Sequence, residues 1–212
     1  MLVGSICWIL TVAYLVVQPI VAAAWPTPYD LTTNSISDLG VTRCGFYPQL
    51  DDRVVYACSP RHALMNVVFV VVGLLTSVGA VLTRGVWPRR RAASVGVAFV
   101  VAAGLGGVLV GLAPANVNLA AHAVGALLQV PGAVGPLLLG VAAWSAQRGV
   151  SALSLLCGLV GSAASLLYLS GTYLRLGPGG MEHLAFDPLT VWTTALGLVL
   201  LGRWVAARRD LR

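Results

Sequence analysis

The sequence contains no lysine and very little charge of either sign. Its basic residues are 13 arginines, its acidic residues number seven, and charged residues make up only 9% of the 212 positions. Hydrophobic residues make up 58%, and the mean hydropathy is +0.88. A soluble domain of this size would have too little polar surface to cover itself. The composition therefore excludes that class and indicates an integral membrane protein.

Six apolar stretches are each long enough to cross a bilayer as a helix, which takes about 20 residues. They cover residues 2–24, 63–83, 92–113, 119–144, 151–174 and 184–205. The first stretch lacks the basic start of a cleaved signal peptide and is too long for one, so we expect a transmembrane helix. Two prolines, Pro131 and Pro136, predict a kink in the fourth. The predicted fold class is all-α: a polytopic membrane protein with a single six-helix domain over residues 1–212.

The arginines are distributed unequally between the two ends of the predicted bundle. Nine follow the second, fourth and sixth helices, whereas Arg43, Arg53, Arg61 and Arg175 lie at the opposite end. The positive-inside rule makes the nine-arginine end cytoplasmic, and both termini with it. The basic charge then reflects topology and contact with anionic membrane lipids, and nucleic acid is not expected as a partner. Six of the seven acidic residues lie at or just beneath the external end: Asp30, Asp38, Asp51, Asp52, Glu182 and Asp187.

One long connection, residues 25–60, joins the first two helices and is external in this topology. It carries five aromatic residues, which argues against disorder and predicts a lid folded onto the helices. Cys44 and Cys58 lie in it on the oxidising side, so we expect a disulfide between them. Ser35 and Asp38 have the spacing of a capping box, and Gly40 is expected to end that turn in the left-handed conformation.

Side chains that hydrogen-bond or titrate concentrate at the external end and suggest a polar pocket there. In one interpretation Asp38, His122 and Glu182 are catalytic, because carboxylates and histidines beside an apolar bilayer are suited to acid–base chemistry. The ligand would be a lipid or an isoprenoid. The residues expected to bind it are Asn34, Ser37, Arg61, His62, Asn66, His183 and Asp187.

A second interpretation makes the protein a non-catalytic binder of lipid or of a partner membrane protein. The same polar residues would then pair internally, for example Arg61 or Arg175 with Asp38 or Glu182, and hold the lid on the helices. A transporter has less support, because no charge is predicted at mid-membrane depth.

The three histidines form a weaker third possibility, a zinc-dependent membrane hydrolase. His62, His122 and His183 lie 60 and 61 residues apart, and each opens a helix that runs inward from the external end. With Asp38 or Glu182 they would supply three His ligands and a carboxylate. Any stack of helical hairpins of this length repeats at this interval, so we expect no cofactor.

Several motifs together resemble a known family. They are N-S-I-S-D-L-G over residues 34–40, R-H-x-x-x-N from Arg61 to Asn66, P-x-N over residues 114–116 followed by His122, Glu182-His183, and P-x-x-x-W over residues 188–192. The chain resembles the DUF998 family of bacterial and archaeal six-helix membrane proteins, and is distantly similar to the Frag1/DRAM/Sfk1 group of lipid-associated membrane proteins. The resemblance implies a multi-pass protein of a bacterial inner membrane and supplies no reaction.

Overall fold

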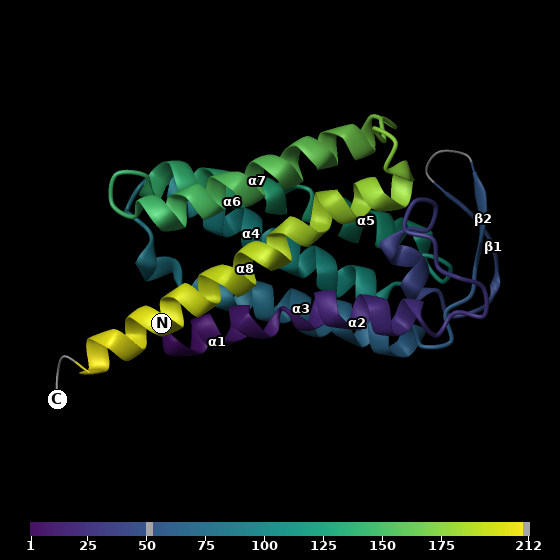
Figure 1. Ribbon diagram of the computed structural model, residues 1–212, viewed down its shortest axis with the longest axis horizontal. Helices are drawn as coiled ribbons and strands as arrows, with labels where there is room; N and C mark the ends of the chain where they lie inside the picture. Colours follow the sequence, from purple (N-terminus) through teal and green to yellow (C-terminus); the bar gives the residue numbers. More distant parts are fainter. Residues whose placement is uncertain (50–52, 210–212) are drawn as a thin grey trace.

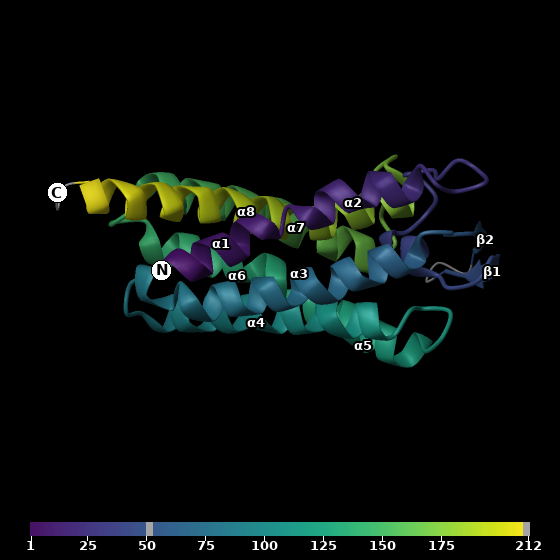
Figure 2. The ribbon, with the colours of Figure 1, turned by 90° about the horizontal axis from the view of Figure 1, so that it is seen from below.

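The chain forms an elongated bundle of helices that run back and forth along one axis in the computed structural model, which describes residues 1–49 and 53–209 (Figures 1 and 2). Six helical segments are long and apolar enough to cross a membrane, which confirms the predicted multi-pass architecture. The start of α1 and the end of α8 lie at the same end of the bundle (Figure 1). Asp51, Asp52, Asp210 and Arg212 fall outside the described residues.

The elements occur in a simple order along the chain. The helices are α1 (Leu2–Leu10), α2 (Ala13–Ala22), α3 (His62–Leu82), α4 (Arg91–Leu112), α5 (Leu119–Gln129), α6 (Pro131–Ala143), α7 (Arg148–Leu169) and α8 (Gly177–Arg209). Two short 3-10 helices are η1 (Ile36–Gly40) and η2 (Arg84–Val86), and two strands are β1 (Gly45–Pro48) and β2 (Val54–Ala57). The strands pair antiparallel, an element that the all-α prediction did not contain.

Two of the predicted spans are interrupted. The first divides into α1 and α2 at Thr11, whose hydroxyl bonds to the Trp8 carbonyl (2.6 Å) and to Thr193 Oγ1 (2.8 Å). A side chain that binds a carbonyl of its own helix in this way bends the helix. The fourth span divides into α5 and α6 at Pro131, one of the two prolines at which a kink was predicted, because Pro131 supplies no backbone N–H.

The last span begins earlier than predicted. The sixth predicted stretch began at residue 184, but α8 starts at Gly177 and includes the run Gly-Pro-Gly-Gly at residues 177–180. A backbone N–H of this first turn, that of Gly179, donates to the Thr32 carbonyl at 3.3 Å. A Cβ on Gly179 would lie 2.6 Å from the Leu31 carbonyl oxygen. The connection from α2 packs so closely here that only glycine fits.

That connection covers the end of the bundle opposite the termini (Figure 2), and we call its described part, within residues 25–60, the lid. Ile36, Leu39 and Val41 are buried in one apolar cluster with Met65 and other residues of α2 and α3. The predicted disulfide between Cys44 and Cys58 is present. The lid is therefore folded onto the helices.

The expectation for Gly40 was wrong. Positive φ among the described glycines occurs at Gly171 and Gly177, and η1 instead leads into an extended Val41 with φ −64° and ψ 130°. Gly40 is needed for close approach, because a Cβ there would lie 2.5 Å from Asn66 Oδ1, while Asn66 Nδ2 donates to the Gly40 carbonyl at 2.9 Å.

Candidate functional site

The site is built around η1, which the lid places on the helix ends. Ser35 and Asp38 form the predicted capping box: Asp38 N donates to Ser35 Oγ (3.2 Å) and Ser35 N donates to Asp38 Oδ2 (2.9 Å). Asp38 is 3% exposed and also accepts from Asn34 Nδ2 (3.4 Å) and Gln49 Nε2 (3.3 Å). Both of its carboxylate oxygens are thus occupied by groups of the lid itself.

Glu182 of α8 binds the same short helix. It lies in the second turn of α8, is 6% exposed, and accepts a hydrogen bond from Ile36 N at 2.8 Å. The first N–H groups of a helix have no partner within the helix. At the start of η1, Asp38 accepts from Ser35 N and Glu182 accepts from Ile36 N, so both of these consecutive groups are hydrogen-bonded. The lid and α8 are joined by a buried hydrogen bond.

His122 holds η1 on α5. Its Nδ1 lies 2.9 Å from the Ala113 carbonyl, which can only accept, so Nδ1 carries the proton. In the neutral ring Nε2 is then an acceptor, and the Ser37 hydroxyl donates to it at 2.9 Å. A hydroxyl held by an oriented histidine is the arrangement of an activated nucleophile. His122 is buried, so the immediate effect of this pair is to fix the lid.

We expect Ser37→Ala to loosen this contact without unfolding the bundle. The substitution removes the hydrogen bond to His122, so the free energy of unfolding should fall by about 1 kcal/mol. Hydrogen–deuterium exchange of residues 34–40 should rise relative to wild type. Ser170→Ala is the matched control, because its hydroxyl is exposed and bonds locally to the Leu167 carbonyl. Equal exchange in both variants would contradict the assignment.

A second histidine faces the lid from α8. His183 Nδ1 donates to Asp187 Oδ2 at 3.0 Å, one helical turn away, and His183 Nε2 lies 3.4 Å from the Tyr29 hydroxyl. Tyr29 also donates to the carbonyls of Asn34 and Ser35. Desolvation raises the pKa of the Tyr29 phenol, and the neighbouring Glu182 and Asp38 carboxylates raise it further, so Tyr29 stays protonated. Unlike Asp38 and Glu182, the His183 and Asp187 side chains keep 16% and 26% of their surface exposed.

The polar contacts continue from this pair toward the middle of the bundle. Asp187 Oδ1 accepts from Gln18 Nε2 of α2 at 3.3 Å. Tyr14 lies one turn from Gln18 on the same face, and it lines a cavity of about 50 Å³. Phe186 and Thr190, on the His183 and Asp187 face of α8, line it too. A polar column thus runs from Tyr29 of the lid to a cavity at mid-bundle depth.

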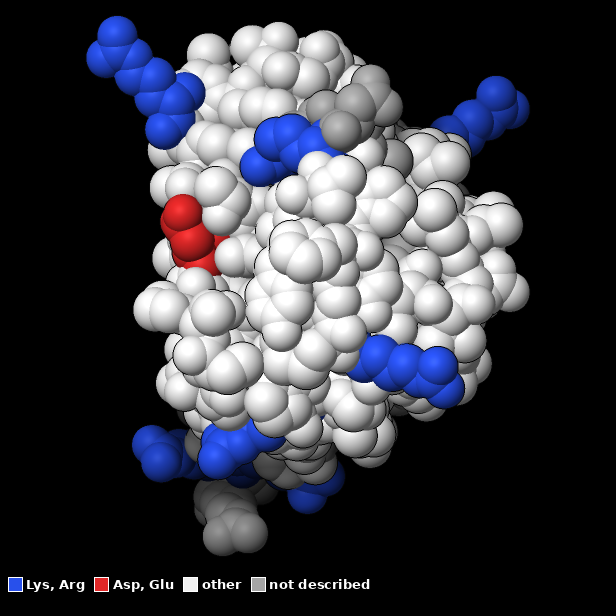
Figure 3. Space-filling model, turned by 90° about the vertical axis from the view of Figure 1, so that its right-hand side faces the viewer, with Lys and Arg blue, Asp and Glu red and all other residues white. Residues whose placement is uncertain are grey.

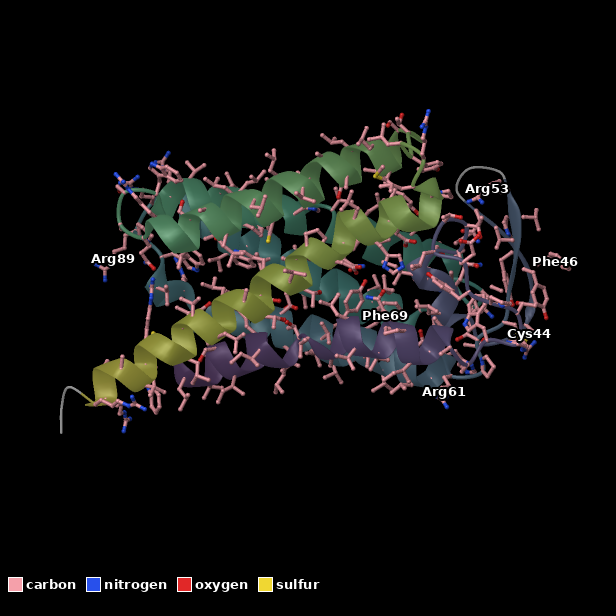
Figure 4. The ribbon with its side chains drawn as sticks, in the orientation of Figure 1. Cys44, Phe46, Arg53, Arg61, Phe69 and Arg89 are labelled. Carbon is pink, nitrogen blue, oxygen red and sulfur yellow. A yellow bond between two sulfur atoms is a disulfide. The ribbon has the colours of Figure 1, made fainter. Side chains whose placement is uncertain are left out.

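The remaining predicted residues have other partners. His62 Nδ1 donates to the Ser59 carbonyl (2.9 Å), and Arg61, which points away from the bundle in Figure 4, donates to the Ile20 carbonyl (3.4 Å). Arg61 therefore does not bind Asp38 or Glu182, and no described contact joins Arg175 to them either. Across residues 1–49 and 53–209, no three His, Cys, Asp or Glu side chains are grouped to hold a metal ion.

Tyr29 and Gln18 belong to the column although they were not among the predicted site residues. Gln18 was detectable as the one amide side chain within the first apolar stretch. Tyr29 could be noticed in the sequence only as one of the aromatic residues in the long connection between the first two helices. Asn116 was missed as well, and it ties the lid to the turn before α5 through Thr42 N (3.1 Å) and Thr42 Oγ1 (3.0 Å).

Comparison with protein families gives one match, which covers almost the entire bundle. Residues 9–199 match the family described as "Protein of unknown function (DUF998)". The chain belongs to the DUF998 family. Neither the comparison with curated proteins nor that with solved structures gives a match.

The motifs by which the sequence resembled DUF998 come together in this structure. Asn34 to Gly40 form η1 and its cap, Asn66 binds the Gly40 carbonyl, His122 binds Ser37, and Glu182 binds Ile36 N. In this DUF998 protein three other motifs therefore contact the short lid helix that the first motif forms.

Proposed function

We propose that this DUF998 protein is an inner-membrane protein that binds a lipid or an isoprenoid at the lid end, and that His183 and Asp187 perform acid–base chemistry on its polar group. One observation carries the proposal. The His183–Asp187 pair is partly exposed and lies at the lid end of the polar column, inside an otherwise apolar bundle. Ionisable residues at such depth are functional candidates, because burying them is costly.

The surroundings of the column support a lipid as the ligand. The cavity beneath the pair combines apolar Phe69, Val72 and Leu189 with polar Tyr14 and Thr190. Its walls are helices of membrane-spanning length, so the bilayer is the medium from which a ligand would enter. At about 50 Å³ the cavity would take only part of an amphiphile, whose polar group would lie beside His183 and whose chain would run along the helices.

The lid contacts support different roles for the acidic residues: two hold the lid, and Asp187 orients His183. Asp38 and Glu182 are buried, and each accepts a hydrogen bond from a backbone N–H at the start of η1. We assign these two residues and His122 to holding the lid. His183 would act as the general base: Asp187 holds its Nδ1 proton, and Nε2, which lies 3.4 Å from the Tyr29 hydroxyl, keeps the lone pair that accepts a proton.

The charge distribution supports the orientation that we propose, with the lid outside and both termini in the cytoplasm. Viewed from the lid end, the surface carries scattered arginines and one acidic patch on a largely uncharged background (Figure 3). The clustered arginines of the α3–α4 connection and of the end of α8 lie at the other end. This is the asymmetry of the positive-inside rule.

The test is native mass spectrometry of protein purified from its membrane in mild detergent. General acid–base catalysis contributes roughly 100-fold to 10,000-fold in rate, so Asp187→Asn should stall turnover while leaving the amide able to bind Gln18. The variant should then retain the unreacted lipid, with a mass different from that bound to wild type. Asp30→Asn is the matched control and should behave as wild type, because Asp30 is an exposed lid carboxylate bound to Thr32.

Two results would count against the proposal. The same lipid at equal occupancy in wild type and Asp187→Asn would make the protein a binder without acid–base chemistry. Absence of any bound lipid from wild type and variant alike would remove the lipid role itself.

A further inference from the structure

The end of the bundle opposite the lid carries a hollow of about 490 Å³ between the α3–α4 connection and the first turns of α4. Arg84, Arg89, Arg90 and Arg91 line it, and Figure 4 shows Arg89 at this end. None of these four has a carboxylate partner within residues 1–49 and 53–209. Four guanidinium groups around one hollow create a strongly positive site without a counter-charge among the described residues.

The hollow is fixed by contacts on its core side. Trp87, which lines it, is 5% exposed and stacks on Trp192 with ring centroids 6.2 Å apart. Trp192 in turn packs against Trp8 at 5.2 Å. Gln147 Nε2 donates to the Val86 carbonyl at 3.1 Å, which ties the same connection to the turn before α7. A site held in this way loses little entropy when it binds a ligand.

Two further features point to an anion. The helix α4 begins at Arg91 without a side-chain cap and without an acidic residue in its first turn. Its first backbone N–H groups are therefore available to an anionic group, as at other helix N-termini that bind phosphate. The buried indole N–H of Trp87 also has no acceptor among the described residues. The wall formed by α4 is apolar, and its Val95 is 43% exposed.

We infer that this hollow binds the phosphate of an anionic phospholipid. The guanidinium groups donate hydrogen bonds to the phosphate oxygens, because the two parallel N–H groups of an arginine match the spacing of two oxygens on one phosphate. The acyl chains run along the apolar face of α4 past Val95. This wall favours a lipid over free phosphate, which would gain nothing from apolar contact. The site is separate from the lid-end pocket and does not depend on the function proposed there.

The experiment titrates the purified full-length protein in mild detergent with phosphatidylglycerol, and follows binding by native mass spectrometry. Each arginine near a membrane surface contributes about 1 kcal/mol to binding an anionic lipid, so removing two should weaken binding by at least about tenfold. The test variant is Arg89→Gln with Arg90→Gln. The matched control is Arg208→Gln with Arg209→Gln, which removes equal charge from the exposed end of α8 at the same side of the bundle.

We expect the control to stay within about twofold of wild type, and both variants to melt within a few degrees of it. Equal weakening in the two double variants would overturn the proposal in favour of a diffuse basic surface. Phosphatidylcholine binding as tightly as phosphatidylglycerol would also overturn it. Inorganic phosphate that binds with the affinity of the lipid, and displaces it, would reassign the hollow to a soluble phosphate and refute the lipid assignment.

Discussion

Asp38→Ala is expected to lower the free energy of unfolding by about 3 kcal/mol. The carboxylate accepts from Ser35 N, Asn34 Nδ2 and Gln49 Nε2, and its loss leaves the buried Ser35 N–H without a partner. An orphaned buried donor costs about 1–3 kcal/mol, and loss of a helix cap adds about 1 kcal/mol. Thermal unfolding in detergent, followed by circular dichroism, measures the change, and limited proteolysis of residues 25–60 should report early release of the lid.

Asp30→Ala is the control for this prediction. Asp30 lies in the same lid and carries the same charge, but it is exposed, and its carboxylate bonds to the neighbouring residues Thr32 and Thr33. Its replacement should change stability by less than about 0.5 kcal/mol. If Asp38→Ala kept wild-type stability and lost turnover of the bound lipid, Asp38 would be catalytic after all, as the sequence first suggested.

The transmembrane architecture was predictable because the bilayer imposes a simple rule on sequence. A span needs about 20 apolar residues, and such runs are visible without knowing how the helices pack. The capping box at Ser35 and Asp38, the break at Pro131 and the pairing of Cys44 with Cys58 were predictable for a similar reason. The capping box and the break at Pro131 depend on local backbone chemistry. The disulfide depends on the oxidising compartment predicted for the loop.

The arrangement of the site was less predictable, because sequence gives depth along a span but not lateral distance. His62, His122 and His183 were placed at similar depth, yet each bonds to a different group: the Ser59 carbonyl, Ser37 and Asp187. The start of α8 was misjudged because Gly-Pro-Gly-Gly is typical of a turn. The deciding factor was the lid backbone at Thr32 and Leu31, which needs glycine beneath it.

The lid-end polar network also shows why acidic residues alone were poor markers of the site. Asp38, Glu182 and Asp187 are alike in type and in predicted depth. Exposure separates them: the first two are 3% and 6% exposed and bind the lid, whereas the Asp187 side chain is 26% exposed. A group that is enclosed and fully bonded stabilises the fold, and one with an open face can meet a ligand.

The second large effect is expected at the crossing of α3 and α4, where Gly104→Ala should destabilise the protein by about 3 kcal/mol. A Cβ on Gly104 would lie 2.5 Å from the Gly73 carbonyl oxygen and 2.9 Å from Ser77 N. Both are backbone atoms, so no change of rotamer relieves the overlap and the helices must separate. In a bilayer, helix association depends on such close packing, because burial of apolar surface adds little.

Gly202→Ala makes the same change in α8 at a position where a Cβ meets nothing within 4 Å. Alanine is the better helix former, so this variant should be neutral or more stable by up to about 1 kcal/mol. The expected changes in the free energy of unfolding have opposite signs in the two variants. Both variants gain helix propensity and only Gly104→Ala meets a steric clash, so the comparison separates helix propensity from packing. Unfolding of each variant by denaturant in mixed micelles measures the two values. A Gly104→Ala protein as stable as Gly202→Ala would show that α3 and α4 do not cross at this close distance.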